Sequence, residues 1–249
     1  MKKKLSRILY KFLSVFVKMA VPRYQTVGAD KLSEEPVIIV ANHSHMYGPI
    51  ACEFYLPCDR YTWCAGQMMH LKEVPAYAFQ DFWSYKPKYI QWFYKILSYL
   101  IAPIAVCIFN NAQTIGVYKD ARIISTFKNT VNRLAEGASV VVFPEHYEPY
   151  NHILNDFQDK FIDIARLYYK KTGKALTFVP MYIAPKLKTM YLGDPVRFDP
   201  QAPMDEQRQK ICSYLKESIT DMAVKLPVHT VVPYVNVPAK EYPKNREVE

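Results

Sequence analysis

The chain lacks the cysteine pattern of either a disulfide framework or a structural zinc site. Its five cysteines are odd in number and unevenly spaced, and its six histidines do not combine with them in a zinc-knuckle pattern. We also expect no secretory signal peptide, because Lys11 and Lys18 interrupt the apolar run after Lys2-Lys3-Lys4 and no small-residue cleavage site follows it. These absences exclude a stapled extracellular scaffold and favour a reducing compartment.

Acidic residues are missing from the start of the chain. Seven basic residues and no acidic one precede Asp30, within a chain whose formal net charge is +9. Apolar residues recur there at helical spacing: Leu5, Ile8, Leu9, Phe12, Leu13, Phe16 and Met19. A basic amphipathic helix of this kind lies in a lipid interface. We therefore predict that residues 1–22 hold the chain, as a peripheral or monotopic protein, at an anionic membrane surface on the cytoplasmic face of the cell membrane. Nucleic acid is not expected as a partner. The alternative is a helix packed on its own domain with a solvated charged face.

No hydrophobic run is long and unbroken enough to predict a membrane-spanning helix. The apolar stretch of residues 100–109 is short and contains Pro103. Residues 75–110 are nevertheless rich in tryptophan and tyrosine, which favour membrane interfaces. This region is interpreted as a hydrophobic platform that enters one leaflet or lines an acyl-chain tunnel. An ordinary core helix followed by a strand is the alternative.

Apolar runs alternate with helical patterns along the remainder of the chain. The length of 249 residues suits one α/β domain. Alternation predicts an α/β fold with a mostly parallel sheet flanked by helices. We place this domain at residues 23–232, and a flexible tail rich in proline and charge at 233–249. The expected strands are 37–41, 139–143, 176–183 and an edge strand near 190–198, and the expected helices begin near 49, 120, 156 and 205.

Polar side chains crowd the ends of two predicted strands. Asn42-His43-Ser44-His45-Met46-Tyr47-Gly48-Pro49 follows the strand at 37–41, and Phe143-Pro144-Glu145-His146 follows the strand at 139–143. Sites in open α/β sheets lie at the carboxyl ends of strands, so these segments are expected to meet. A histidine there has an ordinary pKa near working pH and can act as a general base. For one isolated histidine, capping of a strand would be the simpler explanation.

These motifs, together with Val179-Pro180-Met181-Tyr182-Ile183, resemble the phospholipid/glycerol acyltransferase family, which includes the 1-acylglycerol-3-phosphate acyltransferases. Their order and spacing match over residues 30–200. The resemblance implies that His43 takes a proton from a lipid acceptor hydroxyl, which attacks the thioester of acyl-CoA or acyl-carrier protein in phospholipid biosynthesis. No cofactor besides the acyl donor is implied. The implied substrate-binding residues at the two motifs are Asn42, Tyr47, Phe143, Pro144, Glu145 and His146.

The first departure from the family pattern is Gly48. In the family an aspartate stands five residues after the histidine and orients the imidazole. Loss of such a carboxylate costs up to about 10⁴ in rate in hydrolase triads unless another group replaces it. Candidates for replacement are Glu53, Glu145 and the hydroxyl of Tyr47; His45 is an alternative base or a partner of His43.

The second departure is Glu148. It stands where the family motif Phe-Pro-Glu-Gly-Thr-Arg-Ser has an arginine that is thought to bind the acceptor phosphate. A carboxylate repels phosphate, so a neutral or zwitterionic acceptor headgroup is expected. Lys119 and Arg122, near the family's third basic position around 115–117, remain as candidates for phosphate contacts.

Two alternatives from other functional classes stay open at this point. The first is a catalytically inactive lipid-binding protein on the same fold. The second is a metal-dependent hydrolase that uses Glu145, His146, Glu148 and His152 together with His43 and His45. The spacing of these side chains matches no known zinc signature, so we predict no bound metal.

Overall fold

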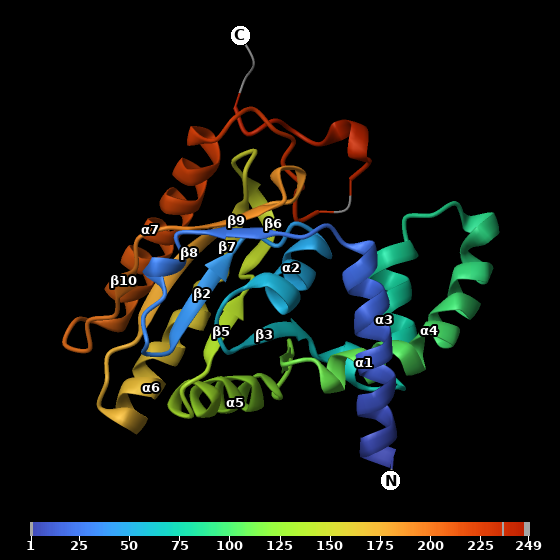
Figure 1. The fold of residues 1–249 in the computed structure, drawn as a ribbon, viewed down its shortest axis with the longest axis horizontal. Coiled ribbons are helices and arrows are strands. Elements are labelled where there is room, and N and C mark those ends of the chain that lie inside the picture. Colours follow the sequence, from blue (N-terminus) through green and yellow to red (C-terminus); the bar gives the residue numbers. More distant parts are fainter. Residues whose placement is uncertain (1, 236, 247–249) are drawn as a thin grey trace. The chain divides into compact units, whose positions relative to one another are not determined.

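The computed structural model describes residues 2–235 and 237–246, without the side chains of Lys2, Lys3 and residues 147–150. The chain forms two compact units (Figure 1). Residues 1–22 and 63–126 make one, called here the helical unit, and residues 23–62 and 127–249 make the other, called the sheet unit. The predicted N-terminal helix therefore groups with residues 63–126.

The sheet unit contains the strand order β1-β9-β8-β2-β5-β3. Strand β2 pairs in parallel with β5 and β8, β3 pairs in parallel with β5, and β1 pairs in parallel with β9, whereas β8 pairs antiparallel with β9 and β10. The predicted α/β class with a mostly parallel sheet is confirmed. The strand bounds are β1 Gln25–Val27, β2 Val37–Ala41, β3 Arg60–Ala65, β5 Ser139–Val142, β8 Thr177–Ala184, β9 Thr189–Leu192 and β10 Val196–Arg197.

The central strands are continuous runs of buried apolar residues. All five residues of β2 and all four of β5 are buried, as expected for strands covered on both faces. The sheet unit also contains the helices α2 (Tyr47–Tyr55), α6 (Asp163–Thr172) and α7 (Met204–Lys225), while α5 (Ile123–Ala135) crosses from the helical unit. Helix α7 packs against β8 (Figure 1), and its residues Ile211, Leu215 and Ile219 are fully buried.

Three elements differ from those expected. The predicted helix at 156 begins only at Asp163, because residues 155–157 form β7 (Asn155–Phe157), which pairs with β6 (Glu145–Tyr150) in a two-stranded sheet. The predicted edge strand becomes β9, which lies between β1 and β8. Strand β3, which no sequence pattern predicted, pairs with β5.

The helical unit consists mainly of α1 (Lys2–Ala20), α3 (Val74–Ala78) and α4 (Gln91–Asn111), with strand β4 at Thr114–Val117. Helices α1 and α4 contact each other, and Asn111 donates to the Ser6 hydroxyl at 2.7 Å. Helix α4 runs on through Pro103. Among the residues that the structure describes, one segment, Lys88–Asn111, has the length and composition to cross a membrane, and one such helix is weak evidence for a span.

The segment predicted as a flexible tail lies against the sheet unit over its described part. Thr230 and Lys244 form an antiparallel bridge, and Val231 donates to the Pro243 carbonyl at 2.9 Å. Asn245 is buried and donates to the Ala223 carbonyl at the end of α7 at 2.8 Å. In Figure 1 this segment passes over the end of the sheet at which β2 terminates.

Candidate active site

Asn42 fastens the histidine loop to the neighbouring strand. Its side-chain amide donates to the Ile183 carbonyl at 3.0 Å, and its Oδ1 accepts the Ile183 N–H at 2.7 Å, so it pairs with the backbone of β8 at both ends. The amide also donates to the Ser44 hydroxyl at 2.8 Å. Asn42 was predicted to bind substrate, and in the structure its donor and acceptor groups hold the loop.

The backbone of the loop turns sharply between β2 and α2. Ser44 and His45 have φ values of 48° and 51°, in the left-handed region that residues with a Cβ rarely occupy. Such strain persists only where surrounding contacts hold it, and it concentrates at functional sites.

Glu145 supports the loop from the second motif. Its Oε1 accepts the backbone N–H of His43 at 2.6 Å, and its Oε2 accepts the backbone N–H of Asn155 at 2.8 Å. The side chain is only 4% exposed. Burial raises the pKa of Glu145 to about 7, against the two hydrogen bonds that lower it. The carboxylate is thus a brace between the end of β2 and β7.

His43 sits between two aromatic rings. Its imidazole meets the rings of Phe143 at 5.0 Å and Tyr234 at 5.6 Å, both edge-to-face. Burial, which is the largest cause, and the charge of nearby His45 together lower the pKa of His43 to about 4, while a backbone contact with His45 opposes both. The imidazole is therefore neutral at pH 7. Its Nδ1 is buried and has no hydrogen-bond partner in the described part of the chain.

Gly48 leaves no room for the missing carboxylate. A Cβ at this position would overlap the carbonyl oxygen of His43 and lie 3.3 Å from the Phe143 ring. Gly48 is the second residue of α2, so the first turn of this helix packs directly on the histidine backbone. The path of the backbone at residue 48 therefore requires glycine, so the difference from the motif is structural as well as a difference in sequence.

The three proposed replacements for the aspartate, and His45, have other partners or positions. Glu53 faces Arg60, whose guanidinium also donates to the Glu53 carbonyl. Glu145 holds backbone N–H groups, and Tyr47 is an exposed residue. His45 bonds through Nε2 to the Val235 carbonyl at 3.1 Å and through Nδ1 to the Tyr242 hydroxyl at 3.4 Å. Among the described residues, none of these groups bonds to His43 Nδ1.

The C-terminal segment supplies site residues that the sequence did not reveal. Tyr234 contacts His43, while Val235 and Tyr242 contact His45 (hydrogen bonds at 3.1 and 3.4 Å, with Tyr242 ring-to-ring at 5.9 Å). Their proline- and charge-rich surroundings are typical of disorder, and no local pattern predicts a contact with a loop almost two hundred residues earlier. Only the three-dimensional fold brings the two segments together.

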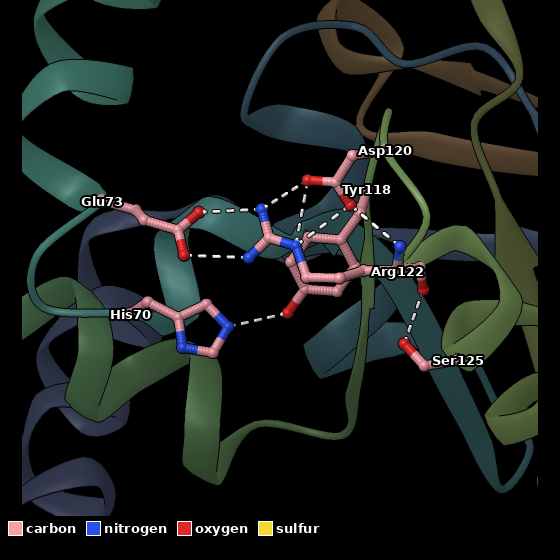
Figure 2. A network of polar contacts seen from close by, with 6 residues as sticks. All are labelled: His70, Glu73, Tyr118, Asp120, Arg122 and Ser125. Atoms are coloured by element: carbon pink, nitrogen blue, oxygen red, sulfur yellow. Dashed lines mark hydrogen bonds and ion pairs between the residues drawn. The ribbon is translucent and has the colours of Figure 1, made fainter.

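Arg122 lies in the helical unit within a network of its own. Figure 2 shows its guanidinium between Glu73 and Asp120, with hydrogen bonds of 2.8–3.2 Å, and stacked 4.1 Å from the Tyr118 ring centroid. The Tyr118 hydroxyl in turn bonds to His70 Nε2 at 2.8 Å. The two carboxylates raise the pKa of Arg122 and satisfy its positive charge. The neighbouring Lys119 is exposed.

Three of the predicted substrate-binding positions remain to be described. Pro144 is buried behind the site, and His146 is half-buried on β6. The side chain of Glu148 lies outside the part of the chain that the structure describes. No group of three or more His, Cys, Asp or Glu side chains among the described residues is arranged to hold a metal ion.

Comparison with known proteins gives a match in structure. No protein-family model and no curated protein matches the sequence. The fold is similar to that in the crystal structure of the 1-acyl-sn-glycerophosphate (LPA) acyltransferase PlsC from Thermotoga maritima, with a TM-score of 0.52 and 14% sequence identity. The similarity covers 91% of this chain and 85% of that chain. It establishes an acyltransferase-like fold and confirms the fold that the motifs predicted.

Proposed function

We propose that the protein is an acyltransferase that moves a fatty acyl group from a thioester donor to the hydroxyl of a lipid acceptor, with His43 as the base. The supporting observation is the placement of His43 at the carboxyl end of β2, on a loop fixed by Asn42 and Glu145, within an acyltransferase-like fold. Such loops hold the catalytic groups of open α/β sheets.

The proposed reaction uses the neutral imidazole of His43. Because Nδ1 is buried, Nε2 accepts the proton of the acceptor hydroxyl while that oxygen attacks the thioester carbonyl. The C–O bond then forms, the C–S bond breaks, and the proton passes to the departing thiolate. Without a carboxylate on Nδ1 the imidazolium is poorly stabilised, and a lowered pKa makes a weak base. We therefore expect slow turnover.

The acceptor is proposed to lack a phosphate monoester. Arg122, one of the two cations that the sequence offered for phosphate contacts, has its guanidinium engaged by Glu73 and Asp120. Glu148 replaces the motif arginine. A monoacylglycerol or a zwitterionic lysolipid avoids the cost of bringing two negative charges together.

The proposed place of action is an anionic membrane surface, on its cytoplasmic face. Helix α1 carries an exposed apolar row that includes Phe12, Phe16 and Met19, and α4 exposes Trp92 and Tyr99. Basic residues Lys4, Arg7, Lys11 and Lys18 share α1 with the apolar row. An amphipathic helix with this composition binds lipid interfaces.

The test is release of free thiol from acyl-CoA and from acyl-carrier protein, with lysophosphatidic acid, lysophosphatidylcholine and monoacylglycerol as acceptors. We expect release that depends on an acceptor other than lysophosphatidic acid and is lost in His43→Ala. Lys210→Ala, at an exposed position of α7, should retain activity. Preference for lysophosphatidic acid would contradict the proposed acceptor class, and equal release by His43→Ala would contradict the proposed base.

A second candidate function is lipid binding without catalysis. The observation that favours it is the partnerless, buried Nδ1 of His43 together with its lowered pKa. Under this alternative neither donor releases thiol, and wild type and His43→Ala bind lysolipid equally well. The metal-dependent hydrolase has less support, since no metal-ligating group of three is found among the described side chains.

A further inference from the structure

The sheet unit contains a cavity that is lined by none of the residues of the histidine loop. Its volume is about 360 Å³, and it is bounded by the tip of the β6–β7 hairpin, one face of α7 and the end of the C-terminal segment. The residues that decide its chemistry are His152, Thr220, Lys244, Asn245 and Arg246. This volume lies within the range of small-molecule sites.

The cavity is lined by cations and neutral polar residues together with the apolar residues Ile153, Val224 and Pro243. Lys244 and Arg246 each contribute a positive charge, and His152 is also among the lining residues, while no Asp or Glu is among them in the described part of the chain. The acidic residue of α7 nearest in sequence to the lining residue Thr220 is Asp221, whose Oδ2 lies 3.9 Å from the Nζ of Lys225. Lys244 keeps one hydrogen bond, to the Thr230 hydroxyl at 3.0 Å. The cavity is therefore electrostatically suited to an anion.

Its walls are held in a fixed shape by hydrogen bonds. Asn151 accepts the N–H groups of Ile153 and Leu154 at 3.1 and 2.9 Å and donates to Thr220 at 3.0 Å, which ties the hairpin tip to α7. His152, between these contacts, has a φ of 68°, a left-handed conformation that is costly for histidine. Asn245 is buried and bonded to the end of α7.

Two segments connect this cavity with the histidine loop. Strand β6 begins at Glu145, which bonds to His43, and its hairpin tip lines the cavity at residues 151–153. Tyr242 bonds to His45, and the next residue of the chain, Pro243, already lines the cavity. The length of β6 sets the separation of the two sites at roughly 15–20 Å, since a strand rises about 3.3 Å per residue.

The geometry points to this cavity as the site for the phosphate-bearing nucleotide of a coenzyme A thioester, with the pantetheine arm extending along β6 to His43. The inference rests on the proposed acyl transfer and selects coenzyme A over a carrier protein as the donor. An extended pantetheine arm matches the separation of the two sites, and a nucleotide with several phosphates matches the cations. A carrier protein presents the same arm without the nucleotide.

Calorimetry with adenosine 3′,5′-bisphosphate, the nucleotide part of coenzyme A, tests the site apart from catalysis. We expect saturable binding that weakens about tenfold in each of Lys244→Gln and Arg246→Gln, as loss of one charge-assisted contact predicts. Lys240→Gln, on the same segment but outside the cavity, should bind like wild type. His43→Ala should also bind like wild type, because it changes the chemical site alone.

The outcomes separate this inference from the proposed function. Acyl transfer from carrier protein with no binding of the bisphosphate would overturn the inference and leave the proposed function standing. Bisphosphate binding that depends on Lys244 and Arg246, without thiol release, would support the nucleotide site and remove the proposed function. Equal affinity for inorganic phosphate, or equal binding by all variants, would overturn the nucleotide assignment. Lys244 and Arg246 are both exposed, but Lys244→Gln also changes the bond to Thr230, so the Arg246 variant stays informative if Lys244→Gln folds poorly.

Discussion

At the scale of single residues, Gly48 gives the sharpest prediction. Gly48→Asp, which introduces the carboxylate that the resembled family has at this position, should lower activity, because the new Cβ would overlap the His43 carbonyl and displace the loop. Overpacking of this kind costs about 1–3 kcal/mol of unfolding free energy. Chemical denaturation and the thiol-release assay measure both effects.

A matched control for this variant is Gly137→Asn. Gly137 has open space around its Cα, and asparagine tolerates its positive φ better than most residues. The control should retain activity. A Gly48→Asp protein that is stable and more active than wild type would show that the loop can move and that the carboxylate is missing for another reason.

His43 and Glu145 should make the free energy of unfolding depend on pH in opposite directions. The pKa of His43 falls from 6.5 to about 4 on folding, so the contribution of His43 to the free energy of unfolding is lost as pH drops from 6.5 to 4. The pKa of Glu145 rises from 4.5 to about 7, so its contribution is lost as pH rises from 4.5 to 7. Relative to wild type, His43→Ala should therefore lose stability with rising pH, and Glu145→Gln should gain it.

Urea denaturation of the three proteins between pH 4.5 and 7 measures these differences. His229, whose pKa burial also lowers, contributes equally to all three and cancels in the comparison with wild type. Variant curves that run parallel to wild type across this range would contradict both pKa shifts.

At this scale the sequence predicted which residues would lie close together, but it did not predict which hydrogen bonds each of them would make. It placed the two motifs at one edge of the sheet because each follows a buried apolar strand. It could not show that the side chains of Asn42 and Glu145 bond to backbone groups. The partner of Asn42, Ile183, lies 141 residues further along the chain, and Glu145 bonds to His43, 102 residues earlier, and to Asn155 on a hairpin strand that no pattern predicted. Hydrogen-bond partners of that kind depend on strand order, which residue patterns leave undetermined.

At the scale of elements, the C-terminal segment is predicted to be a docked part of the sheet unit. Asn245 is buried and bonds to the carbonyls of Ala223 and Leu226 at 2.8 and 3.3 Å, at the end of α7. Asn245→Ala should remove these bonds and lower the unfolding free energy by about 1–3 kcal/mol. Thermal unfolding measures the loss.

Lys240→Ala, on an exposed turn of the same segment, is the matched control and should unfold like wild type. Equal stability of Asn245→Ala and wild type would instead support the flexible tail that composition suggested.

Elements differ in how well the sequence predicts them. Strand β2 is recognisable from its own five apolar residues, whereas β7 exists because β6 pairs with it.

At the scale of the whole molecule, charge and apolar surface should act together in membrane binding. The chain carries a net charge of +9, with its first acidic residue at Asp30, and α1 exposes Phe12 and Phe16 by 60% and 54%. Binding to vesicles that contain anionic lipid should therefore fall several-fold when NaCl increases from about 0.05 to about 0.5 M, since salt screens surface charge. Replacing both phenylalanines with glutamate should weaken it by about 10- to 100-fold, because each buries a large apolar side chain in the interface.

The control for this experiment is a second pair of charged substitutions elsewhere on the surface. Leu167→Glu with Val228→Glu changes two side chains of the sheet unit that are 40% and 42% exposed, and it alters the net charge of the protein by the same amount. If the charge of the whole chain alone attracted the vesicle, both double variants would lose binding equally. Because an interfacial helix requires its own apolar row, we expect only the Phe12/Phe16 variant to lose most of its binding, while its thermal stability stays close to that of wild type.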